Sequence, residues 1–526
     1  MPVNVGTGRD RVRARIAARP ASSPNRLRAS LVDLTFGIWA AALCFALSSR
    51  VLNSDGDLPR HVVMGRHILE DGVRITDTFS HTRAGSPFLA YEWGSQVVLA
   101  AVHAAGGLAA VLVFAALWIA AVYALLVRFL LRRGVDPMLA YLAAIAAALL
   151  GSAHWSARPH LFTFAAVVLL LHWIEPREAP PRPRGRGATI GLLGAGVLFA
   201  VWANVHPGFV LGLAVLGAAA AGSFIESRLR AAEEAARWRG RAVYFAAGLL
   251  IAAAATLATP FGVGLHLHII ELLANPFLMS ETDEFQRLDL VSVYGAVFLL
   301  VLALAAAGLV RGRTRPSFDR IAVVLLLLAG AFTARRNIPL FGLIGVPLLA
   351  LLLDRAWRGV RARALANART VFEEGERIAT PGRYIPWIAG AFVVLGLASG
   401  RIESVRLLPE EFDSRTFPVA AVAEARAAGL EGRIFNEFTW GGYLLYAWPE
   451  QRIFIDGMTD FFGEELARSY LRILRLAPGW EAELERYDVS IAILPPEAPL
   501  AGALGARAWR SWYTDETATI LLRPER

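Results

Sequence analysis

The chain has 526 residues, of which 56% are hydrophobic and 18% are charged, and its mean hydropathy is +0.47. Soluble globular proteins carry about 25% charged residues, so the composition excludes an ordinary soluble enzyme and predicts a polytopic membrane protein. The net charge of +9 comes from arginine alone, because the sequence contains no lysine. We expect no nucleic-acid binding, because the arginines cluster between apolar segments and form no basic face with interleaved aromatic residues.

Eleven segments are apolar enough to predict membrane-spanning helices, on the criterion that a span needs about 20 apolar residues. In chain order they are residues 31–49, 96–126, 137–153, 160–174, 188–203, 209–225, 243–258, 293–310, 321–334, 338–353 and 384–400. The N-terminal stretch and alternate connections are rich in arginine, which predicts that they face the cytoplasm. Exclusive use of arginine and heavy use of alanine favour a GC-rich bacterial source, and hence the bacterial cytoplasmic (inner) membrane.

This topology divides the chain into three regions. We expect a cytoplasmic, arginine-rich tail (1–30), an α-helical transmembrane region (31–400), and an extracytoplasmic C-terminal domain (401–526). The C-terminal region contains β-type runs at 433–435, 452–455, 489–494 and 517–522, and helical stretches at 417–428 and 464–476. Strands that alternate with helices predict a small α/β domain. Within it, Asp456-Gly457 is a turn signal, or else it places Asp456 at a strand end where α/β proteins bind ligands; we favour the turn.

A long polar loop, residues 50–95, follows the first span on the side predicted to be outside. Asp55 and Asp57 stand near its start, directly before a segment (58–69) whose apolar pattern predicts a helix at the membrane surface. Ionisable groups at a membrane edge are functional candidates, because they are costly there without water, a metal or a substrate. One of these carboxylates is a candidate general base or metal ligand. The structural alternative is that an aspartate caps the helix that begins near Pro59.

Histidine and arginine side chains gather in the other connections predicted to be outside. The histidines in or beside these connections are His61, His67, His81, His154, His160, His206, His266 and His268. Imidazole is a natural acid, base and metal ligand, although a single histidine is more often simply hydrogen-bonded. Arg158 and Arg336 depart from the positive-inside rule. Either could hold a phosphate group bidentately, or bind a phospholipid headgroup or a loop carboxylate.

Further carboxylates lie in two of these outer connections. Glu92 precedes the second span, where it lines the same cavity or lies in an aromatic belt beside Trp93. Asp283 and Glu284 lie in the connection 259–292. Carboxylates from two loops that face one cavity suit a divalent cation such as Mg²⁺ or Mn²⁺. If a metal takes part, we expect its ligands to be Asp55, Asp57 and Asp283.

The pattern as a whole resembles the GT-C superfamily of membrane glycosyltransferases, which includes protein O-mannosyltransferases, aminoarabinose–lipid A transferases and catalytic subunits of oligosaccharyltransferases. The resemblance covers nearly the whole chain, and it is strongest to a bacterial group of GT-C-like proteins. The motifs that carry it are Asp-Gly-Asp-Leu-Pro-Arg-His at 55–61 and the segments 65–69, 91–93, 158–159, 204–208, 259–262 and 440–443. It implies a fold of about eleven spans with a C-terminal outer domain.

The resemblance also implies an activity, the transfer of a hexose or pentose from a polyprenyl-phosphate-linked donor to an envelope glycan, lipid or protein. It assigns the role of base or metal ligand to Asp57 or Asp55, with Asp57 preferred, and donor-phosphate binding to Arg158 and Arg336. The remaining substrate-site candidates are His61, Glu92, His206 and Glu284. The sequence departs from the superfamily because Gly56 splits the acidic pair. It also lacks a Trp-Trp-Asp acceptor motif, which disfavours N-glycosylation.

Two alternatives belong to other functional classes. One is a non-catalytic scaffold with a GT-C-like fold, whose outer domain binds envelope polymers. The other is a transporter or flippase of lipid-linked saccharides, which predicts inverted repeats and broken helices with buried charge near the middle of the membrane. The sequence contains no evident repeat, and its charged candidates lie at the outer edge.

Overall fold

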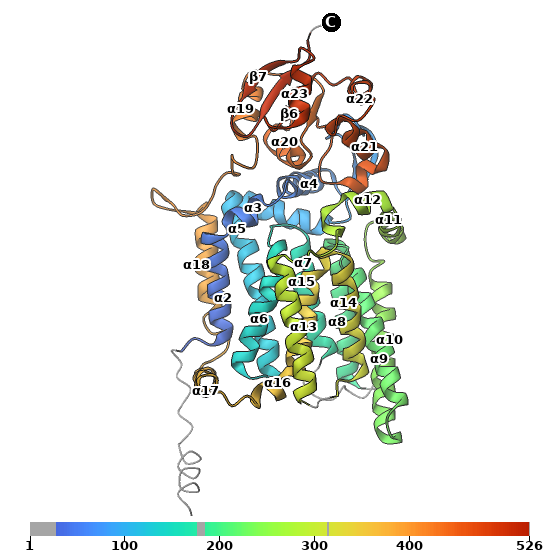
Figure 1. Ribbon diagram of the computed structural model, residues 1–526, viewed down its shortest axis with the longest axis vertical. Coiled ribbons are helices and arrows are strands. Elements are labelled where there is room, and N and C mark those ends of the chain that lie inside the picture. The colour runs from blue at the N-terminus through green and yellow to red at the C-terminus, as the bar shows by residue number, and fades with distance from the viewer. Residues whose placement is uncertain (1–27, 176–184, 313–314, 525–526) are drawn as a thin grey trace, which may run out of the picture.

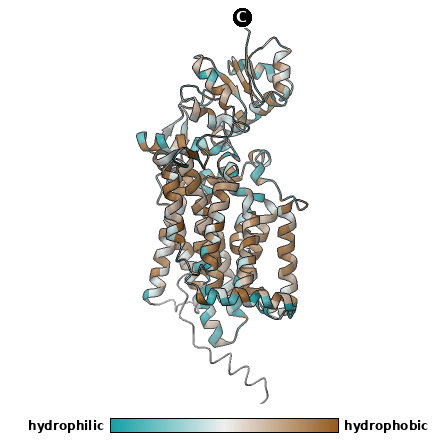
Figure 2. Ribbon diagram, turned by 90° about the vertical axis from the view of Figure 1, so that its left-hand side faces the viewer, coloured by the Kyte–Doolittle hydropathy of each residue, from teal (hydrophilic) through white to brown (hydrophobic). Residues whose placement is uncertain are grey.

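The computed structural model describes residues 28–175, 185–312 and 315–524 (Figure 1). The predicted tail 1–30 therefore lies almost wholly outside the described residues. Long helices form a bundle, and a smaller layer containing the C-terminal residues covers one end of it, which we call the upper end. Hydrophobic residues run along the bundle helices, whereas hydrophilic residues gather at the opposite, lower end and in the upper layer (Figure 2).

The bundle is built from helices that coincide with the predicted spans. They are α2 (Leu31–Ala41), α5 (Trp93–Arg132), α6 (Pro137–Gly151), α7 (His160–Ile174), α8 (Arg186–Val205), α9 (Phe209–Arg228), α10 (Ala232–Ala255), α13 (Val293–Gly312), α14 (Phe318–Thr333), α15 (Ile338–Leu340) with α16 (Val346–Arg358), and α18 (Ile385–Leu397). All eleven predicted segments fall on these helices. Short π-helical turns, Ala42–Ala46 and Phe341–Gly345, follow α2 and join α15 to α16.

Six of the described helical segments are long and apolar enough to cross a membrane. They are Trp93–Arg132, Pro137–His154, Arg186–Val205, Phe209–Arg228, Val293–Gly312 and Arg335–Arg358. Three further predicted spans coincide with the shorter apolar helices Leu31–Ala46, His160–Ile174 and Ile385–Leu397. The two remaining predicted spans, 243–258 and 321–334, lie in α10 and α14. Both helices carry charged residues near their N-terminal ends. The number eleven therefore stays a prediction.

Helix α5 is longer than the predicted second span because it consists of two helical parts that meet at a bend. Gly106 and Gly107 have non-helical backbone angles, and φ of Gly107 is 63°, a region that favours glycine. A Cβ atom on Gly106 would lie 2.5 Å from the carbonyl oxygen of Gly396 in α18. Both glycines are therefore required where α5 turns. The part before the bend runs across the upper end of the bundle (Figure 1).

The upper layer begins with the loop after α2 and α3 (Ser48–Asn53). The predicted surface helix is present as α4 (Asp57–Asp71), which packs against the first part of α5. A hairpin of β1 (Arg74–Thr76) and β2 (Pro87–Leu89) follows it. A second outer segment carries α11 (Val263–Leu273), α12 (Pro276–Glu281) and the 3-10 turn η3 (Asp283–Phe285). The 3-10 turn η4 (Arg335–Asn337) lies beside η3, because the Arg335 N–H donates to the Gln286 carbonyl at 2.8 Å.

The C-terminal residues form a four-stranded sheet in the order β5 (Ile434–Asn436), β6 (Ile491–Leu494), β8 (Thr519–Leu522) and β7 (Arg510–Thr514). Strands β5 and β6 are parallel, and the other two pairs are antiparallel. The accompanying helices are α19 (Val419–Ala427), α20 (Gly441–Ala447), α21 (Thr459–Leu474), α22 (Trp480–Arg486) and α23 (Pro499–Gly505). Strands β5, β6 and β8 coincide with predicted runs, whereas β7 was not predicted.

The predicted run 452–455 was wrong as a strand of this sheet. Ile453 instead exchanges backbone hydrogen bonds with the first outer loop, since its N–H donates to Phe79 and its carbonyl accepts from His81. The run is apolar because Ile453 and Phe454 are fully buried between the loop and the C-terminal residues. The segment thus joins the loop 50–95 to the C-terminal residues and does not extend the sheet.

A buried ion pair joins α4 to the C-terminal residues. Arg60 Nε contacts Asp456 Oδ2 at 2.6 Å, and the two side chains are only 5% and 3% exposed. The guanidinium of Arg60 also lies over the ring of Phe88. The other carboxylate oxygen of Asp456 accepts a hydrogen bond from the Met458 N–H at 2.9 Å, which is the turn that the sequence favoured. The acidic loop, by which we mean the residues from Asp55 to the start of α4, is therefore fixed to the C-terminal residues.

We expect Asp456→Ala to lower the free energy of unfolding by about 3–5 kcal/mol, because it leaves the charge of Arg60 buried without a partner. Chemical unfolding of the purified protein in detergent micelles measures this. Arg426→Gln is the control, because Arg426 and Glu450 form an exposed pair, 49% and 61% accessible, that contributes less than about 1 kcal/mol. Equal effects of the two changes would contradict the role given to Arg60.

Candidate functional site

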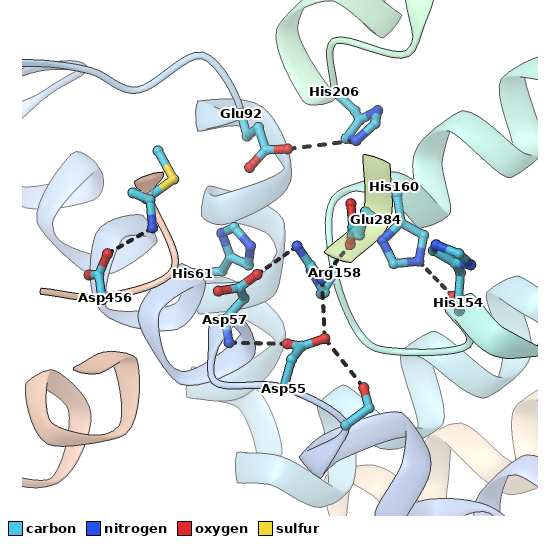
Figure 3. Close-up of polar contacts among 12 residues, drawn as sticks. Asp55, Asp57, His61, Glu92, His154, Arg158, His160, His206, Glu284 and Asp456 are labelled. Carbon is cyan, nitrogen blue, oxygen red and sulfur yellow. Dashed lines mark hydrogen bonds and ion pairs between the residues drawn. The ribbon is translucent and has the colours of Figure 1, made fainter. Parts of the chain in front are cut away.

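One arginine side chain at the upper end binds three carboxylates (Figure 3). Arg158 Nη1 contacts Asp55 Oδ2 at 3.2 Å and Glu284 Oε1 at 3.1 Å. Its Nη2 contacts Asp57 Oδ2 at 2.6 Å. All four side chains are between 20% and 30% exposed, so water or a ligand can reach them. Two loops of the upper end, at 50–95 and 259–292, thus converge on the start of α7.

Local backbone contacts place Arg158 and the acidic pair. The loop before α7 is tied to α3, because the Ala157 N–H donates to the Val51 carbonyl at 2.9 Å. Asp55 Oδ1 accepts a hydrogen bond from the Asp57 N–H at 3.1 Å, while its other oxygen contacts Arg158. The capping alternative is wrong, because the N-cap of α4 is Gly56 and no side chain among the described residues caps this helix. Asp55 instead supports the residue that begins α4 and takes part in the cluster.

Glycines let the C-terminal residues pack directly on the acidic loop. A Cβ atom on Gly56 would lie 1.7 Å from the Thr439 carbonyl oxygen, and one on Gly442 would lie 2.1 Å from the Gly56 carbonyl oxygen. A Cβ atom on Gly457 would lie 2.1 Å from Asp57 Oδ1. The motifs at 440–443 and 456–457 stand out in the sequence, but their spacing did not indicate that Gly442 packs on Gly56 or that Gly457 packs on Asp57.

The cluster holds its carboxyl groups in different states of ionisation. Burial raises the pKa of Asp57 to about 6, with a contribution from the neighbouring Asp55 carboxylate and against the attraction of Arg158. Burial also acts on Glu284, but the charges of Arg158 and Arg336 outweigh it and hold the pKa of Glu284 well below its usual range. Despite burial, the surrounding carboxylates raise the pKa of Arg158, which stays charged.

Four of the predicted histidines lie near this cluster, namely His61, His154, His160 and His206 (Figure 3). Burial and the nearby positive charge of arginine lower the pKa values of His61 and His206 well below the usual range, so both imidazoles are neutral. The other outer histidines make separate contacts: His67 with Asp71, His81 with the Ile434 carbonyl, His266 with Thr256 and His268 with Asp460.

Arg336 lies in η4, beside the 3-10 turn η3 that carries Glu284. Its guanidinium stacks over the ring of Phe285, 4.6 Å from the centroid. Its charge lowers the pKa values of both Glu284 and His206. No ion pair joins Arg336 to a carboxylate in the part of the chain that the structure describes. It is therefore a cation available to an anionic ligand.

Asp283 is not part of the cluster, contrary to its predicted place beside Asp55 and Asp57. Its side chain is 88% exposed and pairs with Arg335 at 3.2 Å. Asp283 and Glu284 are successive residues of the 3-10 turn η3, whose side chains point in directions about 120° apart. Only Glu284 can therefore reach Arg158.

The predicted metal site does not fit this arrangement. Within the described residues, no group of three or more His, Cys, Asp or Glu side chains is arranged to hold a metal ion. Carboxylate oxygens are suitable ligands for Mg²⁺ or Mn²⁺, but those of Asp55, Asp57 and Glu284 converge on the guanidinium of Arg158. A positive charge already stands where these carboxylates meet, and we assign no chemical step to a metal.

We expect Gly457→Ala to destabilise the protein by about 1–3 kcal/mol, because the new methyl group displaces the carboxylate of Asp57. The three atoms nearest to that methyl position all belong to the Asp57 side chain. In an Asp57→Ala background the same substitution should therefore have little effect, a coupling that unfolding in detergent measures as a double-mutant cycle. Gly502→Ala in α23 is the control, since its Cβ meets open space. Additive effects of the changes at 457 and 57 would refute the contact.

Comparisons with known proteins address the fold. No protein-family model matches the sequence, and no curated protein matches it. The solved structures that it resembles include the oligosaccharyltransferase of Archaeoglobus fulgidus in its apo form, with a TM-score of 0.53 and 13% identity over 88% of this chain and 69% of that one. The same enzyme, AglB, in complex with an inhibitory peptide and a dolichol-phosphate matches with a TM-score of 0.52 and 13% identity over 89% and 69%.

A third structure of that oligosaccharyltransferase, in complex with Zn and sulfate, matches with a TM-score of 0.51 and 14% identity over 89% of this chain and 68% of that one. These neighbours are GT-C membrane glycosyltransferases. The resemblance predicted from the sequence motifs is therefore confirmed at the level of the fold: the chain is largely helical and shares the fold of these GT-C membrane glycosyltransferases.

Proposed function

We propose that the chain is a glycosyltransferase that moves a hexose or pentose from a polyprenyl-phosphate-linked donor to an acceptor of the cell envelope. The observation that carries the proposal is the cluster around Arg158. It combines an ionisable carboxylate, Asp57, with a cation free to bind phosphate, Arg336, on a fold shared with membrane glycosyltransferases. The acceptor is a glycan, lipid or protein at the membrane.

The charge distribution supports an extracytoplasmic site. Among the described residues, arginines are frequent at the lower end, in the connections that follow α5, α9, α13 and α16. By the positive-inside rule the lower end faces the cytoplasm, so the upper end and the C-terminal sheet lie outside the bacterial cytoplasmic membrane. A site at this face of the membrane suits a donor sugar that is anchored in the membrane by a lipid. The neighbouring oligosaccharyltransferase was solved with a dolichol-phosphate.

The proposed reaction is a direct displacement at the anomeric carbon. Asp57 accepts the proton of an acceptor hydroxyl, and the oxygen of that hydroxyl forms a bond to the anomeric carbon. The bond from this carbon to the phosphate oxygen breaks, and its electron pair leaves with the polyprenyl phosphate. Arg336 binds the phosphate, on which negative charge grows during the reaction. Arg158 holds Asp57 in place, because positioning of the reacting groups supplies much of the acceleration.

The pKa of Asp57 suits a general base. With a pKa of about 6, the carboxyl group is mostly ionised at neutral pH and is a stronger base than an ordinary aspartate. The phosphate leaving group is stable as an anion and requires no proton. The mechanism therefore needs one base and one cation, and it gives Asp55 and Glu284 the role of orienting Arg158 from two loops.

We expect Asp57→Asn to lower the rate of sugar transfer by about 10²–10⁴-fold, because it removes the base. The assay supplies the protein in nanodiscs with membrane acceptors and labelled pentoses and hexoses linked to polyprenyl phosphate. Wild-type transfer should decline as the pH falls through about 6, where Asp57 becomes protonated. Asp71→Asn, at the exposed end of the same helix, should leave transfer unchanged. Full transfer by Asp57→Asn would refute the assignment of Asp57 as the base, whereas absence of transfer by the wild type would favour the scaffold alternative.

We expect Arg336→Gln to weaken binding of polyprenyl phosphate by about 10- to 100-fold, because a hydrogen bond between charged partners is lost. Arg336→Lys should recover part of the affinity, since lysine keeps the charge but not the fork of donors. The neighbouring Arg335→Gln is the matched control, because Arg335 is 46% exposed and already pairs with Asp283. Titration of lipid into protein in nanodiscs measures the affinity, and equal losses for the two glutamine variants would contradict the role of Arg336.

A further inference from the structure

Glu92 and His206 face each other beside the Arg158 cluster without forming a hydrogen bond. Glu92 directly precedes α5, and His206 directly follows α8. His206 Nε2 lies 3.8 Å from Glu92 Oε1, and the side chains are 10% and 12% exposed (Figure 3). Hydrogen bonds of this type are about 2.7–3.2 Å long. The two polar edges are thus close, mostly enclosed and not hydrogen-bonded to each other.

The proton of the His206 imidazole lies on Nε2, because its other nitrogen is an acceptor. The Gly208 N–H donates to His206 Nδ1 at 3.0 Å. Thr163 Oγ1 lies 2.8 Å from the same nitrogen and itself accepts a hydrogen bond from Trp202 Nε1 at 2.8 Å, so the threonine proton is directed at Nδ1. A nitrogen that receives these donors carries no proton. The neutral ring therefore presents a fixed Nε2–H donor toward Glu92.

Glu92 is a neutral acid at neutral pH. Burial raises its pKa to about 8; the nearby carboxylates of Asp460 and Asp57 add to the rise, and Arg158 and Arg60 oppose it. In the part of the chain that the structure describes, no hydrogen bond engages the carboxyl group of Glu92. The group therefore offers one O–H donor and one carbonyl acceptor.

The geometry suits a single hydroxyl group. An oxygen atom about 2.9 Å from both His206 Nε2 and Glu92 Oε1 would form the apex of a triangle whose base is their 3.8 Å separation. Such an oxygen can accept from Nε2–H and donate to the carboxyl oxygen, which requires a group that does both. Neither an anion nor a cation is favoured, because both partners are neutral.

Resting on the proposed function, we propose that Glu92 and His206 bind a hydroxyl group of the sugar carried by the lipid donor. His206 Nε2–H donates to the hydroxyl oxygen, and the hydroxyl donates to Glu92 Oε1. The pair therefore selects polyprenyl phosphate that carries a sugar over polyprenyl phosphate alone.

The test compares the affinities of the full-length protein in nanodiscs for farnesyl-phosphate-linked pentoses and hexoses and for farnesyl phosphate. Wild type should prefer at least one sugar-carrying lipid by tenfold or more. His206→Asn keeps an acceptor for the Gly208 N–H and the Thr163 hydroxyl but removes the Nε2 donor, and it should lose this preference. His206→Gln, whose amide nitrogen reaches the Nε2 position, should retain part of it. Binding of farnesyl phosphate should stay unchanged in all three proteins.

A second part of the test uses Glu92→Gln and measures how the preference for the sugar-carrying lipid depends on pH. In wild type the preference should fall as the pH rises through about 8, because an ionised Glu92 attracts the His206 Nε2–H to itself and removes it from the ligand. Glutamine keeps a donor and an acceptor but does not titrate, so the preference of this variant should not depend on pH. Glu70→Gln, on the exposed side of α4, should behave as wild type.

The outcomes separate this inference from the proposed function. If wild type transfers no sugar but prefers the sugar-carrying lipid, and His206→Asn loses that preference, the transferase assignment fails and the hydroxyl site stands. If wild type transfers sugar but His206→Asn keeps the full preference, the hydroxyl site is refuted alone. Equal affinity of wild type for all the lipids also refutes it.

Discussion

The site depends on one guanidinium group that three carboxylates share. Arg158 stands at the start of α7, and its partners come from the first outer loop and from the loop before α13. These segments are far apart in the sequence and have no other reason to present carboxylates to the same point. An arginine whose side chain is only 23% exposed is stabilised by counter-charges, and a carboxylate near a membrane is stabilised by a cation. Each side of the cluster therefore requires the other, and the loops are held together as a result.

The unequal balance of charge in this cluster allows proton exchange in addition to holding the loops together. Three carboxylates face one guanidinium, so its positive charge cannot stabilise the ionised form of all three equally. Glu284 is held ionised, whereas burial leaves Asp57 able to exchange a proton near pH 6. Carboxyl groups whose environments push their pKa values apart are the usual basis for dividing acid and base roles. Packing of Gly457 against Asp57 from the C-terminal side fixes the same carboxylate from a second direction.

Much of the fold could be predicted from the sequence because apolar length and arginine placement act locally. The bundle helices and the surface helix α4 follow from these patterns. Arg158 and Arg336 were found because they depart from the charge rule, a signal that needs no knowledge of contacts. The pairing of Arg158 with Glu284, the exclusion of Asp283, and the contact between Gly457 and Asp57 depend on how distant loops pack. Spacing along the chain carries no information about such contacts.

The most direct test of the account is a structure of the protein bound to a polyprenyl-phosphonate sugar that cannot be cleaved. The account predicts that the phosphonate contacts Arg336, that the anomeric carbon faces Asp57, and that the lipid chain runs down the bundle from the upper end. A sugar bound away from Asp57, or a ligand seated only in the groove between α2 and α18 that Asp33 and Tyr384 line, would contradict it.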